Sequence, residues 1–160
     1  MAIVNPAGSW VKVIALQLIA LATVSCAHGD ALSSDLDDSE RETSVVVVLK
    51  EWYVLPDKRS VDSGRVTFEV TNHGRMDHEF IVIKTTVPVH DLPIHEKGLD
   101  EKKAGKQIGE IEDIHPGETR EMTLRMTPGS YVLFCNKVEI EDHKIISHYR
   151  HGMRIAFTVR

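Results

Sequence analysis

FCNKVEIEDHKIISHYRHGM, which runs from Phe134 to Met153, is the stretch of sequence that decides the fold. It places one cysteine, three histidines and a methionine between two segments that alternate like β-strands. The other cysteine of the chain, Cys26, lies far upstream in an apolar leader. A lone thiol of this kind is either an inert buried side chain or a metal ligand. The density of imidazole and thioether groups around it favours the metal ligand.

The phase of the strands places these groups on inward-facing positions. Cys135 continues the alternation of Tyr131 and Leu133, at the end of the segment SYVLFC. Met153 opens the apolar face of the last segment, and His78 opens that of HEFIVIK. Because alternate residues of a strand share one face, all three side chains are expected to point inward near strand ends. If the strands that carry Cys135 and Met153 pair, these two residues lie close together.

The rest of the chain shows the composition of short strands and turns. The other predicted strands are SVVVVLKEWYVL (44–55), RVTFEVT (65–71), QIGEIEDI (107–114) and TREMTLRM (119–126). Gly and Pro mark the turns between them, and only a short helix is expected, over 95–103. This pattern predicts an all-β fold, an antiparallel Greek-key β-sandwich.

The candidate ligands suit copper best. Two imidazoles and a thiolate, with a weak axial thioether, form the copper electron-transfer site. Zinc sites use cysteines, or histidines with carboxylates, and have no need of methionine. The sequence contains no paired H-x-H motifs, which a multicopper oxidase needs, so we expect that the protein is not an enzyme. A cysteine hydrolase that uses Cys135 and His148 is a weaker alternative, because this thiol is predicted to face inward.

At these residues the sequence resembles the cupredoxins, the small blue copper proteins, over about 45–159. The matching pieces are FEVTNHG followed by HEF, then PGE, PGSYVLFCN and SHYRHGM, in this order. The resemblance implies a cupredoxin-like sandwich with one type 1 copper ion. It also implies the copper ligands, which are His78, Cys135, His148 and Met153.

Two features depart from the usual cupredoxin pattern. The spacing C-x12-H-x4-M is long, because the insertion KVEIEDHKIIS (137–147) separates Cys135 from His148 and adds His143. His143 and His151 compete with His148 as the second histidine ligand or could assist it, and the match to H-Y-x-x-G-M favours His148. Glu79 stands where the family often has an asparagine that ties the two ligand loops together.

The N-terminus has the composition of an export signal. Lys12 precedes an apolar run that ends in small residues, which predicts a secretion signal peptide over 1–27 with cleavage after Ala27. Cleavage before Cys26 with a lipid anchor is the alternative. An acidic flexible linker over 28–42 and a cupredoxin domain over 43–160 complete the predicted organisation. We therefore expect a periplasmic or extracellular protein, with no membrane span after cleavage.

The resemblance implies a one-electron carrier that cycles between Cu(II) and Cu(I). An edge of the second histidine, His148, is the expected electron port. The expected partners are redox proteins such as a cytochrome or a copper oxidase or reductase, and the formal charge of −5 favours a basic partner surface. Nucleic acid is not expected, because Lys and Arg form no basic patch, and we expect a monomer. The alternative function is copper binding and delivery for copper supply or tolerance, motivated by His143 and His151.

Overall fold

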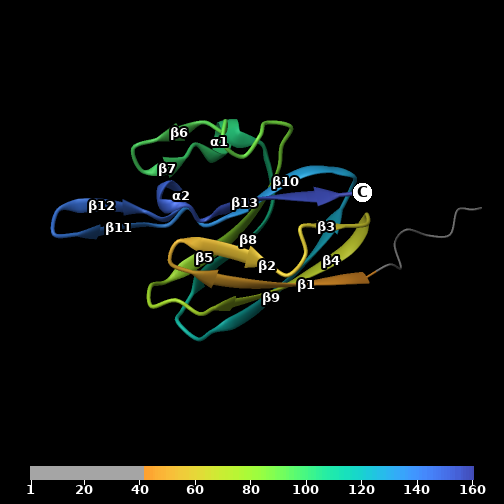
Figure 1. The fold of residues 1–160 in the computed structure, drawn as a ribbon, viewed down its shortest axis with the longest axis horizontal. Helices are drawn as coiled ribbons and strands as arrows, with labels where there is room; N and C mark the ends of the chain where they lie inside the picture. The colour runs from red at the N-terminus through yellow and green to blue at the C-terminus, as the bar shows by residue number, and fades with distance from the viewer. Residues whose placement is uncertain (1–41) are drawn as a thin grey trace, which may run out of the picture. The chain divides into compact units, whose positions relative to one another are not determined.

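Two β-sheets pack face to face in the computed structural model, which describes residues 42–160 (Figure 1). The first sheet has the order β2-β1-β4-β9. Its strands are β1 (Glu42–Lys50), β2 (Tyr53–Pro56), β4 (Gly64–Asn72) and β9 (Thr119–Met126). The predicted signal peptide and residues 28–41 of the predicted linker lie outside the described residues.

The second sheet has the order β3-β13-β10-β5-β8 and carries most of the candidate site. Its strands are β3 (Ser60–Val61), β5 (His78–Lys84), β8 (Lys106–Ile114), β10 (Gly129–Phe134) and β13 (Arg154–Val159). Strand β10 pairs antiparallel with both β5 and β13. The start of β5, the end of β10 and the start of β13 therefore meet at one end of the sandwich. The prediction of a β-sandwich is confirmed.

The core lies between the inner faces of the two sheets, where the predicted alternation places the apolar side chains. Val66, Phe68 and Val70 of β4 are fully buried. The ring of Phe68 lies 5.4 Å from that of Phe80 and 5.8 Å from that of Phe157, measured between centroids. Each such side chain contributes roughly 1.5–3 kcal/mol by leaving water. Burial therefore holds the two sheets, and the strand ends they carry, in a fixed relation.

Two details of the strand prediction are wrong. The segment over 44–55 is a hairpin, β1 and β2, joined by a turn at Glu51 and Trp52. No Gly, Pro or Asn marks this turn, so the sequence gives no local signal for it. Strands β1 and β4 pair in parallel, as do β3 and β13. The chain visits β3 in the second sheet before it returns to β4, and this crossover produces the parallel pairing.

Segments between the strands cover the end of the sandwich where the site lies. Strands β11 (Val138–Glu141) and β12 (Lys144–Ser147) form a hairpin that extends away from the sandwich beside α2 (His148–His151) (Figure 1). The excursion after β5 contains β6 (Ile94–His95), β7 (Gly98–Leu99) and α1 (Glu101–Ala104). The helix predicted over 95–103 is therefore mostly wrong, because Ile94 and His95 pair with Leu99 and Gly98. No helix within residues 42–160 is long and apolar enough to cross a membrane.

Candidate metal centre

Cys135 follows directly on β10 and is fully buried. Its backbone N–H donates to the carbonyl oxygen of Met153 at 3.0 Å, which extends the antiparallel pairing of β10 and β13 by one step. The expected proximity of Cys135 and Met153 is thus confirmed at the backbone. The side chain of Met153 is also fully buried and belongs to the same core cluster as Cys135.

The two histidines reach Cys135 from different elements. His78 is the first residue of β5, and its Nδ1 lies 3.9 Å from the Cys135 Sγ. His148 is the first residue of α2, and its Nδ1 lies 3.3 Å from the same sulfur. The Ser147 hydroxyl caps α2 by accepting the N–H of Arg150, as is usual at a helix start.

Backbone hydrogen bonds hold His148 on both sides. Its N–H donates to the carbonyl oxygen of Lys137 at 2.9 Å, and its own carbonyl oxygen accepts the N–H of Met153 at 3.1 Å. Gly152 has φ +124°, a value that side-chain-bearing residues rarely adopt, and it turns the chain from α2 toward β13. The loop from His148 to Met153 is therefore short and tied at both ends.

The three donor atoms form a compact triangle. The two Nδ1 atoms of His78 and His148 lie 3.1 Å apart, and the Cys135 Sγ completes the triangle at 3.3 and 3.9 Å. These residues are the only group of three or more His, Cys, Asp or Glu within residues 42–160 that could hold a metal ion. A point about 2 Å from all three atoms lies inside the triangle, which is close to the length of a metal–imidazole bond. The spacing therefore fits one ion in a trigonal plane.

Burial sets the protonation of the ligands. It lowers the pKa of His148 to about 4, with help from the nearby His78 and Lys137. Burial also lowers the pKa of His78, against the opposing effect of Glu51 and Asp77. Both imidazoles are thus neutral near pH 7, as ligands must be. Burial raises the pKa of the Cys135 thiol to about 12, so a metal ion must displace its proton.

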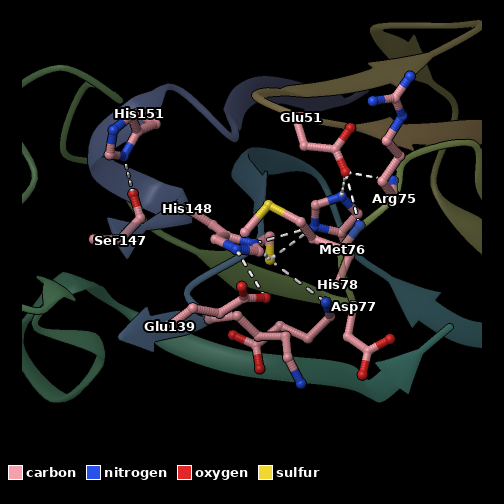
Figure 2. Close-up of polar contacts among 12 residues, drawn as sticks. Glu51, Arg75, Met76, Asp77, His78, Glu139, Ser147, His148 and His151 are labelled. Carbon is pink, nitrogen blue, oxygen red and sulfur yellow. Dashed lines mark hydrogen bonds and ion pairs between the residues drawn. The ribbon is translucent and has the colours of Figure 1, made fainter. Parts of the chain in front are cut away.

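Each histidine turns its second nitrogen toward a glutamate that the sequence analysis missed. Neither Nε2 makes a hydrogen bond, although both are fully buried. The Nε2 of His78 lies 3.7 Å from Oε1 of Glu51, and that of His148 lies 3.7 Å from Oε1 of Glu139. Figure 2 shows dashed lines that join His78 to the carboxylate of Glu51 and His148 to that of Glu139. Carboxylates behind metal-bound histidines orient the rings and raise their basicity.

Glu51 is itself held in place by the turn that precedes β5. Its Oε1 accepts the N–H groups of Arg75 at 2.5 Å and Met76 at 2.9 Å (Figure 2). Partial burial raises the pKa of this carboxyl, but the two N–H donors outweigh it and the pKa is lowered. A Cβ on Gly74 would lie 2.9 Å from the His78 Nε2 and would collide with the Glu51 carboxylate. Only glycine at this position leaves room for the pair. The sequence pattern around Gly74 marked a turn but gave no sign of Glu51.

Glu79 ties the two ligand loops together, although an asparagine is usual at this position. Its N–H donates to the Cys135 Sγ at 3.4 Å, and its Oε1 accepts the N–H of Asn136 at 2.8 Å. Burial raises the pKa of Glu79 to about 7, against the lowering effect of the Asn136 N–H. The side chain oxygen of a glutamate therefore makes the link from β5 to the residue that follows the cysteine.

His148 does not reach the surface, contrary to the expectation of an exposed imidazole edge. Its side chain has no exposed area. The rings of Trp52 and His148 form a T-shaped pair, with centroids 5.4 Å apart, and the insertion supplies Glu139. Sequence analysis could not foresee this cover, because Trp52 comes from the unrecognised turn between β1 and β2.

The two other candidate histidines lie outside the triangle. His143 is exposed in the turn between β11 and β12, at φ +63°. His151 is exposed at the end of α2 and stacks on Trp52, with ring centroids 4.4 Å apart and planes 29° apart. Neither belongs to the group of donor atoms that lie within 4.8 Å of one another.

Comparison with solved structures identifies the fold. Reduced auracyanin from the photosynthetic bacterium Roseiflexus castenholzii aligns with a TM-score of 0.51 and 19% identity, over 74% of this chain and 97% of that one. Auracyanin B aligns with a TM-score of 0.50 and 15% identity, over 76% of this chain and 90% of that one. No protein-family model and no curated protein matches the chain. The described domain has the cupredoxin fold.

The candidate site is of the kind associated with that fold. Two histidines, a cysteine and a methionine are the ligand set typical of one type 1 copper ion. His78, Cys135 and His148 are fully buried, and their donor atoms lie 3.1 to 3.9 Å from one another.

Proposed function

We propose that this protein binds one copper ion and carries single electrons. His78, Cys135 and His148 would hold the ion in a plane, and Met153 would be the weak axial ligand. The observation that carries the proposal is the triangle of two Nδ1 atoms and one Sγ, in which all three side chains are fully buried. When bound, the copper ion supplies the one-electron couple between Cu(II) and Cu(I).

The enclosure of the ligands supports electron transfer rather than catalysis. A catalytic metal site keeps an open position for water or substrate, whereas this one is surrounded by core side chains and by Trp52. A rigid ligand set also suits an electron carrier, because both oxidation states then share one geometry. The proposal therefore assigns no enzymatic activity to the protein.

Copper delivery is the alternative function, and the observed positions of the extra histidines do not favour it. His143 lies at the exposed tip of the hairpin, and His151 is stacked on Trp52. Neither histidine lies beside the buried thiol, where it could pass a copper ion on. A buried site of this kind would exchange copper slowly with chelators, which is the opposite of what delivery needs.

The cellular setting belongs to the same proposal. Removal of residues 1–27 would leave Cys135 as the only cysteine, so the exported protein could form no internal disulfide. The partner would be an exported redox protein, such as a cytochrome or a copper oxidase or reductase. A periplasmic or extracellular location follows from this reading, with a lipid anchor at Cys26 as the alternative form.

The test is a visible spectrum of the protein with one equivalent of Cu(II), recorded beside the Cys135→Ser variant. The expected result is an intense absorption band that requires Cys135, disappears with ascorbate and returns with ferricyanide. If Cys135→Ser binds Cu(II) equally well and neither protein shows the band, the electron-carrier proposal is wrong. Copper binding through histidines would then be the better reading.

A further inference from the structure

The buried position of His148 raises the question of how an electron reaches the copper site. Its side chain has no exposed area, so a partner cannot touch its ring. On one side the Nε2 faces the carboxylate of Glu139 at 3.7 Å. On another side the His148 ring forms a T-shaped contact with the ring of Trp52, at 5.4 Å between centroids and an interplanar angle of 77°. An edge-to-face pair of this kind is in van der Waals contact.

Trp52 connects this buried ring with the surface. The ring of Trp52 also stacks on that of His151, at 4.4 Å between centroids and 29° between planes. Trp52 is half-buried and packs against the main core, whereas His151 is exposed. Two ring-to-ring contacts therefore lead from a candidate copper ligand to solvent.

His151 is fixed in this position by its own helix. Its Nδ1–H donates to the carbonyl oxygen of Ser147 at 2.8 Å (Figure 2). A histidine anchored in this way cannot rotate freely away from Trp52. The stack is thus a built feature of the short segment between two candidate ligands, His148 and Met153, and not an accidental contact of a free surface side chain.

The other histidine offers no comparable route. The Nε2 of His78 faces Glu51, whose carboxylate is occupied by the N–H groups of Arg75 and Met76. Carboxylate groups carry charge but provide no extended π system for electronic overlap. Among the described residues, the ring contacts of the two candidate histidine ligands are with each other and with Trp52.

We infer that electrons enter and leave the copper site through the stacked pair of Trp52 and His151. This inference rests on the proposed function. In the reducing direction, a one-electron donor is oxidised and Cu(II) becomes Cu(I). Trp52 and His151 supply the path, and neither changes its oxidation state nor exchanges a proton. Trp52 and His151 are positioning residues for electron transfer and not ligands.

The experiment measures intramolecular electron transfer from two surface points. A photoreducible ruthenium polypyridine label is attached to a cysteine introduced by His151→Cys, where the label takes the place of the His151 ring beside Trp52, or in a matched protein by His143→Cys. Cys26 is replaced by serine in every labelled protein, and copper-bound Cys135 is buried, so neither competes for the label. Each labelled, copper-loaded protein is compared with its Trp52→Leu form by flash photolysis, and the absorption band and midpoint potential of each protein are recorded.

The expected result is a position-dependent effect of Trp52→Leu. Transfer from the label at position 151 should slow by about tenfold, equivalent to about 1.4 kcal/mol in activation free energy. Transfer from the label at position 143 should stay unchanged, because His143 lies on the hairpin tip and makes no ring contact with Trp52. Trp52→Phe keeps a ring and should slow transfer from position 151 less than Trp52→Leu does.

Two results would overturn the inference while the proposed function stands. One is an intact copper band with equal transfer rates, with and without Trp52→Leu, in the protein labelled at position 151. The other is an equal slowing from both label positions, which would show that Trp52→Leu acts on the copper site and not on the path. If no Cys135-dependent band forms in the unlabelled wild-type protein, the proposed function fails, and the inference fails with it.

Discussion

The Nε2 of His148 lies 3.7 Å from the Oε1 of Glu139, a residue of the insertion that separates His148 from Cys135. The insertion that lengthens the ligand loop thus also places a carboxylate beside the His148 ligand. A negative charge at this distance stabilises the more positive oxidation state of a bound metal.

Glu139→Gln is therefore expected to raise the midpoint potential of the copper-loaded protein. The substitution removes the charge and keeps the shape of the side chain. A rise of about 60 mV would correspond to a tenfold gain in the affinity for Cu(I) relative to Cu(II). Glu141→Gln is the matched control, since Glu141 lies two residues further along β11 and is exposed. The midpoint potentials are measured by voltammetry. If both variants shift the potential equally, Glu139 acts only as general surface charge.

Met153→Leu should keep the copper–thiolate band and raise the midpoint potential. Loss of the thioether weakens the coordination of Cu(II), while Cys135 and the two histidines remain. Met126→Leu is the control, because Met126 is also a buried methionine of the main core. Both substitutions nearly conserve volume, so each should lower the free energy of unfolding by less than about 1.5 kcal/mol. If Met153→Leu leaves the midpoint potential unchanged, Met153 is not a copper ligand.

Copper loading should release one proton from Cys135. The thiol has its pKa raised to about 12 and is protonated without metal, whereas His148, with its pKa near 4, has no proton to lose at pH 8. Addition of Cu(II) to a weakly buffered solution at pH 8 should therefore acidify it by one equivalent per copper ion bound. The Cys135→Ser variant should release no proton. Release of two or more equivalents would mean that a histidine also enters the site protonated.

Glu79→Gln should stabilise the metal-free protein at and above pH 7. The raised pKa of Glu79, about 7 against an ordinary 4.5, means that the folded state retains a proton which the unfolded state has lost. The free energy of unfolding therefore falls as the pH rises from 4.5 through 7. The amide introduced by Glu79→Gln cannot ionise and can still accept the Asn136 N–H, so the variant should gain up to about 3 kcal/mol over the wild type above pH 7.

Below pH 4.5 the Glu79→Gln variant and the wild type should unfold alike, because Glu79 is protonated in both states there. The low pKa values of His78 and His148 act in the opposite direction as the pH falls, but they do so in both proteins and cancel in the difference. Urea unfolding at a series of pH values measures the difference. A constant difference across the range would show that Glu79 does not retain its proton in the fold.

The parts of the fold that follow from strand alternation could be predicted from the sequence. The period of two in RVTFEVT predicts that Val66, Phe68 and Val70 face inward, and the same period predicts the inward position of Cys135; all four residues are fully buried. Burial enforces this period, so it is visible locally. The direction of pairing is different, because the parallel pairing of β1 with β4 depends on where the chain travels between them.

The candidate site likewise has residues that the sequence predicts and residues that it does not. The donor residues were found because their chemical types are unusual and their order in the chain is distinctive. Glu51, Glu139 and Trp52 were missed because each lies in a segment whose path the sequence does not reveal, a hairpin turn or an insertion. Their role depends on distances of a few ångströms between residues far apart in the chain, such as the 3.7 Å from Glu51 to His78.

The hairpin of β11 and β12 is closed at its base, where Val138 pairs with Ser147 and the His148 N–H donates to the Lys137 carbonyl oxygen. The separation of Cys135 and His148 in space is therefore set by this closure and not by the number of residues in between. The tip of the hairpin, at Asp142 and His143, can be lengthened, shortened or changed in sequence while the donor atoms keep their spacing. The tip of the loop that looked like the chief irregularity of the sequence is thus a modular part, on which partner recognition can evolve or be engineered, while Glu139 nearer the base stays beside His148.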